Sequence, residues 1–339
     1  MKGTFGTVAL AAAFLGLSAP TAVSGILDDV KERNELRCGV NPGLAGFSMQ
    51  DAAENWSGFD IDYCRAIAAA VLGDPTAVQF VPLTTRDRFR ELQSGKVDVL
   101  VRDTAWTMAR DTAFGLTFAG VNYFSGIGFM VPKSLGIDSA LQLTGARVCL
   151  ETGSTVEASV TEYFAARGMA YTPVPVADPA ALRAAYEAGT CNVATGEQVA
   201  LYGMRLTLGA PDESLVLPEL LSKEPYGPVV LRDDPQWFAV VKWVHFALLN
   251  AEEMGVTSEN VDAMLGAPSE EARNLLGANG AFGEGVGLAN DWAAVMIRAV
   301  GNYGEIFDRN LGERSELKIA RGLNALWTNG GLQFAPPVR

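Results

Sequence analysis

Short runs of β-forming residues alternate with stretches of helical periodicity in the first third of the chain. The β-forming runs lie at 36–40, 78–82 and 97–101, and the helical stretches lie at 26–33, 60–72 and 86–94. Asp60 is predicted to cap the second helix, and Gly73 to end it. The order β-α-β-α-β predicts a parallel sheet with binding loops at the carboxyl ends of its strands.

A second pattern of the same kind starts near residue 133. Strands are predicted at 147–150, 171–176 and 191–195, with helices from the small residues 152–155 to 167 and at 179–188. Apolar residues then lead into a long helix at 235–253, and the remainder consists of helical segments broken by glycine and asparagine. The chain is therefore predicted to fold into two similar α/β units.

The second unit is inserted into the first, so one lobe is discontinuous. We expect lobe 1 to comprise 25–132 and 229–339, with a helical C-terminal extension from about 255, and lobe 2 to comprise 133–228. The crossovers near 130–135 and 222–230 are expected to form a hinge. Two lobes on such a hinge close a cleft around a small ligand.

The first 24 residues have the pattern of a secretory signal peptide. Lys2 supplies the positive charge, residues 7–17 form an apolar run, and small residues at 22–24 precede a cleavage position before Gly25. The run is too short for a membrane-spanning helix. The alternative is a buried first helix, but the pattern favours export of the mature chain.

The composition is that of a globular protein with a sizeable core, since 49% of the 339 residues are hydrophobic and 19% are charged. The formal net charge of −13 argues against nucleic acid as a partner, because nucleic acids attract patches of Lys and Arg. No cofactor motif is visible. These features leave a small-molecule ligand as the expected partner.

Four cysteines in an exported chain suggest two disulfides, and three pairings are possible. Sequence distance favours Cys38 with Cys64 and Cys149 with Cys191. Metal binding is the rival hypothesis. It is disfavoured because no C-x-x-C is present and the single histidine, His245, lies in the apolar helical stretch "WVHFALL". We expect His245 to be packed rather than to bind a metal.

The polar residues of "LVRDTAWTMARD" directly follow the third predicted strand. Arg102, Asp103, Thr104 and Arg110 lie within this stretch. The carboxyl end of a parallel strand is where binding residues gather in α/β folds. No Ser/His/Asp set, HExxH motif or cysteine nucleophile accompanies them. The stretch is therefore predicted to bind a ligand rather than to catalyse a reaction.

Several motifs resemble one known family: "CGVNPGLAGFS", "WSGFDIDYCRAIAAAVLGDP", "LQSGKVDVLVRDTAWTMARD", "GVNYFSGIGFMV", "ETGSTVE", "LPELLSKEPYGPVV" and "NYGEIFDRNLG". They are similar to the periplasmic solute-binding proteins of ABC amino-acid transporters, in the general L-amino-acid-binding branch of family 3. The resemblance covers 25–339. It implies a two-lobed Venus-flytrap fold, a periplasmic monomer, and delivery of the ligand to an ABC permease in the inner membrane.

A free amino acid carries an ammonium and a carboxylate, and a closed site must pair both because unpaired buried charges are very costly. The resemblance implies that Arg110 binds the carboxylate, since arginine offers a bidentate fork, with Arg102 as the alternative. Gly153, Ser154 and Thr155 start a helix and are expected either to bind the same anion or simply to cap that helix.

The resemblance implies that Glu197 binds the ammonium, although the family usually has an aspartate there. Asp103 and Ala105 also depart from the family, which usually has an amide and a hydroxyl at these positions. If Asp103, Glu151 and Glu197 all face the cleft, the site favours a cationic ligand. If Asp103 instead pairs with an arginine, the net charge is unchanged. Asn192 and Ala194 are further departures.

The remaining contacts are expected from Thr85 and from Leu44 and Phe47, which lie in the glycine-containing segment after the first strand. Two other functions are alternatives to this one. The first is an enzyme on the same fold, of the dehydratase or lytic type, and the second is a sensory or adaptor protein. The resemblance favours a transport protein that binds L-amino acids or related amines and catalyses no reaction.

Overall fold

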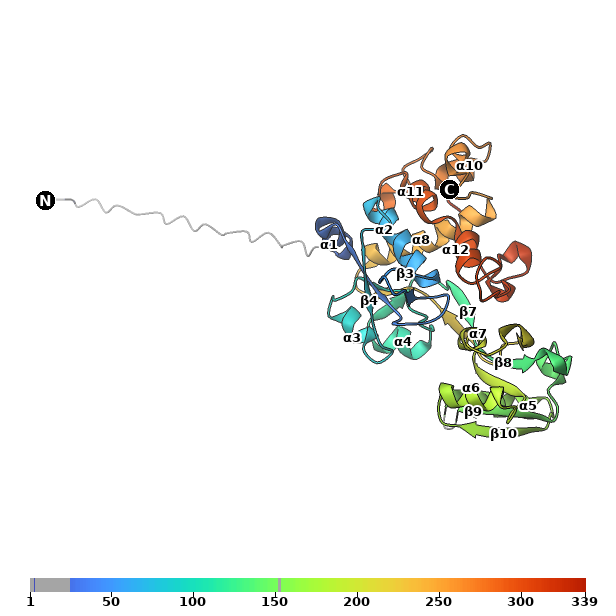
Figure 1. Cartoon of the computed structure of the whole chain (residues 1–339). Helices are drawn as coiled ribbons and strands as arrows, with labels where there is room; N and C mark the ends of the chain where they lie inside the picture. Colours follow the sequence, from blue (N-terminus) through green and yellow to red (C-terminus); the bar gives the residue numbers. More distant parts are fainter. Residues whose placement is uncertain (1–2, 4–24, 152–153) are drawn as a thin grey trace.

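The computed structural model describes residue 3 and residues 25–151 and 154–339. The predicted signal peptide, 1–24, lies outside the described residues apart from Gly3. Figure 1 shows two α/β units joined by narrow connections, with the C-terminal helices packed on the first unit. Within the part of the chain that is described, no helix combines the length and the apolar character needed to cross a membrane.

The first unit is built on a five-stranded sheet of order β4-β1-β5-β14-β6. Strands β4, β1 and β5 are parallel, as predicted, while β14 pairs antiparallel with β5 and β6 at the other side of the sheet. The elements are β1 (Leu36–Val40), β4 (Val78–Pro82), β5 (Val99–Leu100), β6 (Leu116–Phe118), β14 (Val229–Leu231), α1 (Ile26–Arg33), α2 (Phe59–Leu72), α3 (Arg88–Gln93) and α4 (Met108–Ala113), with a small hairpin of β2 (Met49–Gln50) and β3 (Trp56–Ser57).

The second unit contains a sheet of order β10-β9-β11-β8-β12. Its elements are β8 (Ile127–Pro132), β9 (Ala146–Glu151), β10 (Tyr171–Val176), β11 (Val193–Glu197), β12 (Ser214–Val216), α5 (Thr155–Ala166), α6 (Pro179–Glu187) and α7 (Gln198–Leu206). β8 pairs with β11 and β12, so 127–132 belongs to this sheet although the sequence placed these residues in lobe 1.

Two short strands connect the units. β7 (Tyr123–Ser125) pairs antiparallel with β13 (Glu224–Tyr226), and the pairing places Phe124 opposite Pro225. These strands lie before and after the second unit in sequence. They are therefore the hinge candidates, a few residues earlier at the first crossover than the range 130–135 that was expected.

The C-terminal part supplies a helical layer that packs on the first unit. Its elements are α8 (Pro235–Glu253), α9 (Val261–Met264), α10 (Glu270–Leu275), α11 (Trp292–Val300) and α12 (Tyr303–Asn310), with 3₁₀ turns at Glu284–Val286, Gly322–Asn324 and Trp327–Asn329. α11 lies against α2, and Arg309 of α12 pairs with Asp62 of α2 at 2.8 Å. Besides α5, α6 and α7, the second unit has short 3₁₀ turns at Lys133–Leu135, Ala140–Gln142 and Pro211–Glu213, and among its described residues it has no comparable extra helical layer.

Each unit contains one disulfide, with the pairing that the sequence distances favoured. Cys38 of β1 is bonded to Cys64 of α2, and Cys149 of β9 is bonded to Cys191 just before β11. All four residues are buried. Each bond therefore joins two elements of one sheet unit and does not cross the hinge.

The start of α2 differs from the prediction. Gly58, not Asp60, occupies the cap position, with φ 133. A Cβ on Gly58 would lie 2.2 Å from Phe47 O, so this approach requires glycine. The Asp60 side chain is free to turn inward, where its Oδ2 accepts the N–H of Asp103 at 3.1 Å. A residue predicted to cap a helix thus connects α2 to the end of β5.

Candidate ligand-binding site

The polar stretch after β5 lies against the hinge. Ala105 forms an isolated antiparallel bridge with Tyr226 of β13. Thr104 O accepts the N–H of Gly227 at 3.2 Å, and the Thr104 side chain is fully buried. The chain path of the predicted site residues is therefore fixed by the second hinge strand, which places them where the two units meet.

Asp103 lies in the left-handed region, with φ 44. Its Oδ1 accepts a hydrogen bond from Asn41 at 2.9 Å and lies 4.0 Å from Arg102 Nη2. Burial raises the pKa of Asp103, and the Arg102 guanidinium opposes this shift. Burial also raises the pKa of Asp60 well above its usual range, and the neighbouring Asp103 carboxylate adds to that increase. This geometry supports the alternative in which Asp103 is balanced by arginine.

Arg110 is held at the start of α4. Thr107 caps this helix by accepting the N–H of Arg110 at 3.3 Å, and Arg110 Nη1 donates to Ala105 O at 2.7 Å. The guanidinium uses one donor on the backbone, and its remaining donors are available to a ligand. A bidentate fork fixed in this way suits a carboxylate.

Two more arginines, Arg102 of this stretch and Arg88 of α3, are buried. The sequence interpretation missed Arg88. Arg88 of α3 is 4% exposed and Arg102 is 2% exposed. Burial lowers the pKa of Arg88 to about 10, and the positive charges of Arg102 and Arg110 contribute to that decrease. One signal could have identified Arg88: it is four residues from the buried Leu92, so it lies on the apolar face of its helix.

Glu197 ends β11 and faces the hinge. Its side chain is exposed, and the hydroxyl of Tyr226 donates to its Oε2 at 3.4 Å. Surrounding protein atoms raise the pKa of Glu197, and the carboxylates of Asp103 and Glu224 raise it further, while Arg110 opposes the shift. The carboxylate of the second unit and the arginines of the first are therefore within electrostatic range of one another.

The other predicted contacts in the second unit lie near Glu197. Glu151 and Glu197 line a cavity of about 330 Å³ on this unit. Ser154 donates from Oγ to Glu151 O at 2.6 Å and caps α5, which agrees with the simple capping alternative. Gly153 lies outside the described residues, and the Thr155 side chain does too.

The remaining predicted contact residues differ in burial. Phe47 is 1% exposed and packs edge-on against Tyr123, with ring centroids 5.0 Å apart, so it belongs to an aromatic core. Leu44 is partly buried against that core. Thr85 is exposed, and its hydroxyl is 3.5 Å from Arg102 Nη2. Direct contact of these three residues with a ligand stays a prediction.

The single histidine is packed, as expected. His245 is 2% exposed, its Nδ1 is 3.1 Å from the Tyr63 hydroxyl, and burial lowers its pKa to about 4. Within residues 25–151 and 154–339, no group of three or more His, Cys, Asp and Glu side chains is placed to hold a metal ion.

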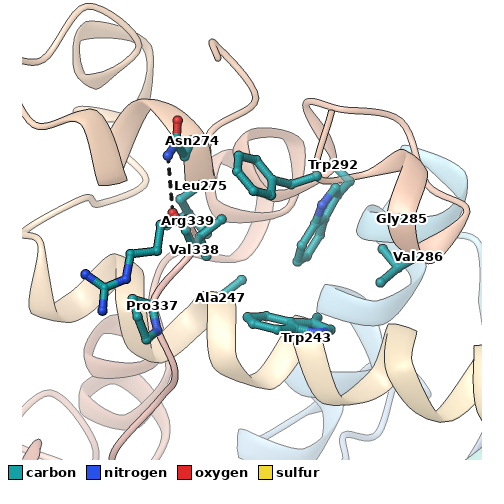
Figure 2. A pocket seen from close by; sticks show the side chains of 11 residues that line it. Trp243, Ala247, Asn274, Leu275, Gly285, Val286, Trp292, Pro337, Val338 and Arg339 are labelled. Carbon is teal, nitrogen blue, oxygen red and sulfur yellow. Dashed lines mark hydrogen bonds between the residues drawn. The ribbon is translucent and has the colours of Figure 1, made fainter. Parts of the chain in front are cut away.

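A separate cavity of about 270 Å³ lies in the helical extension. Figure 2 shows that Trp243 of α8 and Trp292 of α11 line it, and that Asn274 donates to Val338 O at 3.3 Å at its edge. The lining is mainly apolar, and none of the residues predicted from the sequence lies there.

The family is decided by a match along most of the chain. The model of bacterial extracellular solute-binding proteins, family 3, matches residues 36–267. The chain belongs to this family. Its fold and its solute-binding role are therefore those that the sequence motifs led us to expect.

Relatives with known names match this chain over nearly their whole lengths. The chain is 50% identical to the general L-amino acid-binding periplasmic protein AapJ of Rhizobium johnstonii, over 100% of both chains. It is 48% identical to the glutamate/glutamine/aspartate/asparagine-binding protein BztA of Rhodobacter capsulatus, over 99% of this chain and 98% of that one. A periplasmic binding protein of an ABC transporter from Brucella ovis, solved with glutathione bound, is 50% identical with a TM-score of 0.81, covering 94% of this chain and 100% of that one.

Proposed function

We propose that this protein binds a small solute that carries both an amino group and a carboxylate, most simply an L-amino acid, and delivers it to an ABC permease. The observation that carries the proposal is the placement of opposite charges on two units that share a hinge. Arg110 lies on the first unit and Glu197 on the second. The names of the relatives, amino-acid-binding proteins and a glutathione-bound protein, point to the same ligand chemistry.

Closure of the two units would strengthen the ion pairs between the protein and the ligand. Glu197 is exposed here, and an ion pair that water surrounds is worth little. When the units close on a ligand, water leaves, and both charges of the zwitterion gain a partner in a less polar medium. In this proposal Arg110 binds the α-carboxylate and Glu197 binds the ammonium, and the closed form is the one that the permease recognises.

The proposed setting is the periplasm. A cleaved segment at 1–24 would direct export, and the two disulfides fit an oxidising compartment. The relatives named above are binding proteins, so we propose pure binding without turnover, by a monomer.

The direct test is to identify what the protein carries. Mass spectrometry of compounds released from the purified, denatured protein is expected to show amino acids or small peptides. Calorimetry of the stripped protein with the twenty amino acids should then give at least one dissociation constant in the micromolar range or below. Absence of any amino-acid or peptide ligand in both measurements would overturn the proposal and favour a sensory or adaptor role.

A further inference from the structure

Two buried guanidinium groups in the candidate site have N–H donors without acceptors. Among the described residues, Nε of Arg88 and both Nε and Nη1 of Arg102 are buried without a hydrogen-bond partner. The polar neighbours of Arg102 Nη2 are distant: Thr85 Oγ1 at 3.5 Å and Asp103 Oδ1 at 4.0 Å. The Arg88 guanidinium lies over the Phe89 ring, 4.8 Å from its centroid. Such groups are rare in native proteins, and each needs an explanation.

Four half-buried arginines show what a paired guanidinium group looks like in this chain. Arg33, Arg65, Arg309 and Arg321 have side chains that are 22%, 32%, 35% and 27% exposed, and each reaches a carboxylate at 3.2 Å or less. Arg88 and Arg102 are more deeply buried than any of these four. Removing a charge from water without a partner is strongly unfavourable. Arg88 and Arg102 are thus the most deeply buried of these arginines, and the nearest carboxylate to either in an ion pair is Asp103, 4.0 Å from Arg102 Nη2.

The position of this pair links it to the ligand. Arg88 interacts electrostatically with Arg102 and Arg110, and also with the carboxylates of Asp103 and Glu197. The first unit therefore brings three guanidinium groups to the site, with Asp103 as the carboxylate among them. Burial raises the pKa of Asp60 well above its usual range. The three guanidinium groups outnumber the one that an α-carboxylate needs.

We propose that Arg88 and Arg102, together with the Thr85 hydroxyl, form a second anion subsite that binds a carboxylate on the side chain of the ligand. This inference rests on the proposed function, in which Arg110 binds the α-carboxylate and Glu197 the ammonium. It replaces the cationic ligand considered from the sequence by an acidic one. Acidic amino acids and small γ-glutamyl peptides share this chemistry.

The test compares ligands that differ only in one charge. Glutamate, glutamine, aspartate, asparagine and glutathione are titrated into stripped wild-type protein by calorimetry. We expect glutamate or glutathione to bind at least about tenfold more tightly than glutamine, since a charge-assisted hydrogen bond is about twice as strong as a neutral one. If glutathione binds more tightly than glutamate, the second carboxylate belongs to a peptide. If glutamate binds more tightly, it belongs to a free amino acid.

Arg88→Met and Arg102→Met then locate the subsite. Each is expected to weaken the acidic ligand by about 30-fold and to leave glutamine within about threefold. In ligand-free protein, each should keep or raise the thermal midpoint, because an unpaired buried charge is removed. Arg65→Met is the matched control. It breaks the 3.2 Å ion pair between Arg65 and Asp62, which is not part of the proposed site. It should therefore lower the thermal midpoint and leave the ratio of the glutamate and glutamine affinities unchanged.

The outcomes separate the two proposals. If wild-type protein binds glutamine as tightly as glutamate, or if both variants weaken the two ligands equally, the second subsite is overturned while the proposed function stands. If wild-type protein binds no amino acid or peptide at all, the proposed function fails and the subsite fails with it.

Discussion

The two α/β units share one plan and differ in what they bring to the site. In each unit three strands pair in parallel, two more are joined to them through antiparallel pairing, and one disulfide is present. The first unit also has the helical extension packed behind it, and it holds buried arginines. The second unit presents Glu197, an exposed carboxylate at a strand end. The first unit keeps its arginines out of water, whereas the second unit leaves the Glu197 carboxylate exposed.

This difference has a thermodynamic meaning. A rigid, well-packed unit can hold guanidinium groups in place before the ligand arrives, so little ordering remains when it binds. In the proposed function, the second unit, with its exposed carboxylate, completes the site when the two units close. The comparison predicts that the first unit determines which anion is bound and that the second contributes to closing the site.

The disulfides test whether the units are stabilised separately. Cys149→Ala with Cys191→Ala opens a loop of 42 residues, and the chain-entropy model gives a loss of about 4 kcal/mol in the free energy of unfolding. Because the second unit lacks a helical extension, urea denaturation should show it unfolding in a first, separate transition. The paired variant Cys38→Ala with Cys64→Ala, with a separation of 26, should destabilise the first unit instead. A single unshifted transition in either variant would contradict the comparison.

Arg110 tests the anion-binding side. Arg110→Ala removes the fork that the Ala105 carbonyl holds, and it should weaken any carboxylate ligand by about 200-fold, or about 3 kcal/mol, measured by calorimetry. The thermal midpoint should stay nearly constant, because Arg110 is only partly buried. Arg90→Ala, on a side chain that is 71% exposed, is the control and should leave affinity unchanged. Unchanged affinity in Arg110→Ala would refute its assignment as the carboxylate clamp.

The sequence predicted the elements better than it predicted the side chains. The long helix at 235–253, the parallel strands of both units and both disulfides follow from periodicity and spacing, because those features act over short distances along the chain. The antiparallel strands β6 and β14 complete the first sheet from distant parts of the sequence, and β6 was not predicted at all.

Side-chain roles depended on contacts that no local pattern encodes. Aspartate is a residue type typical of a helix cap, but Gly58 takes the cap position. Asp60 accepts a hydrogen bond from the backbone N–H of Asp103 instead. Arg88 was overlooked because a charged residue in a short helix is normally on the surface. Only the packing of α3 shows that it is buried beside Arg102.

Glu197 tests the opposite side of the site. Glu197→Gln keeps the shape and removes the charge, so an amino-acid ligand should bind about 30-fold more weakly, or about 2 kcal/mol. The pKa of Glu197 is raised, so wild-type affinity should fall on acidification at a higher pH than for an ordinary glutamate. The variant should lack that part of the pH profile. Glu162→Gln, exposed on α5 of the same unit, is the control. An unchanged pH profile in Glu197→Gln would exclude this residue as the ammonium partner.

The last test uses the only histidine, which lies in α8 behind the first unit. Burial lowers the pKa of His245 to about 4, while the unfolded chain has a pKa near 6.5. Below pH 6.5 the unfolded state binds a proton that the folded state excludes, so stability present at neutral pH is lost as the pH falls toward 4.

Between pH 7.5 and 5.5, wild-type protein should lose about 1.4 kcal/mol more than His245→Gln, measured by urea denaturation of the first unit. The transition of the second unit, which has no histidine, should show no such difference between the two proteins. Equal pH dependence of the first unit in both proteins would show that the buried imidazole does not make this unit the acid-sensitive one.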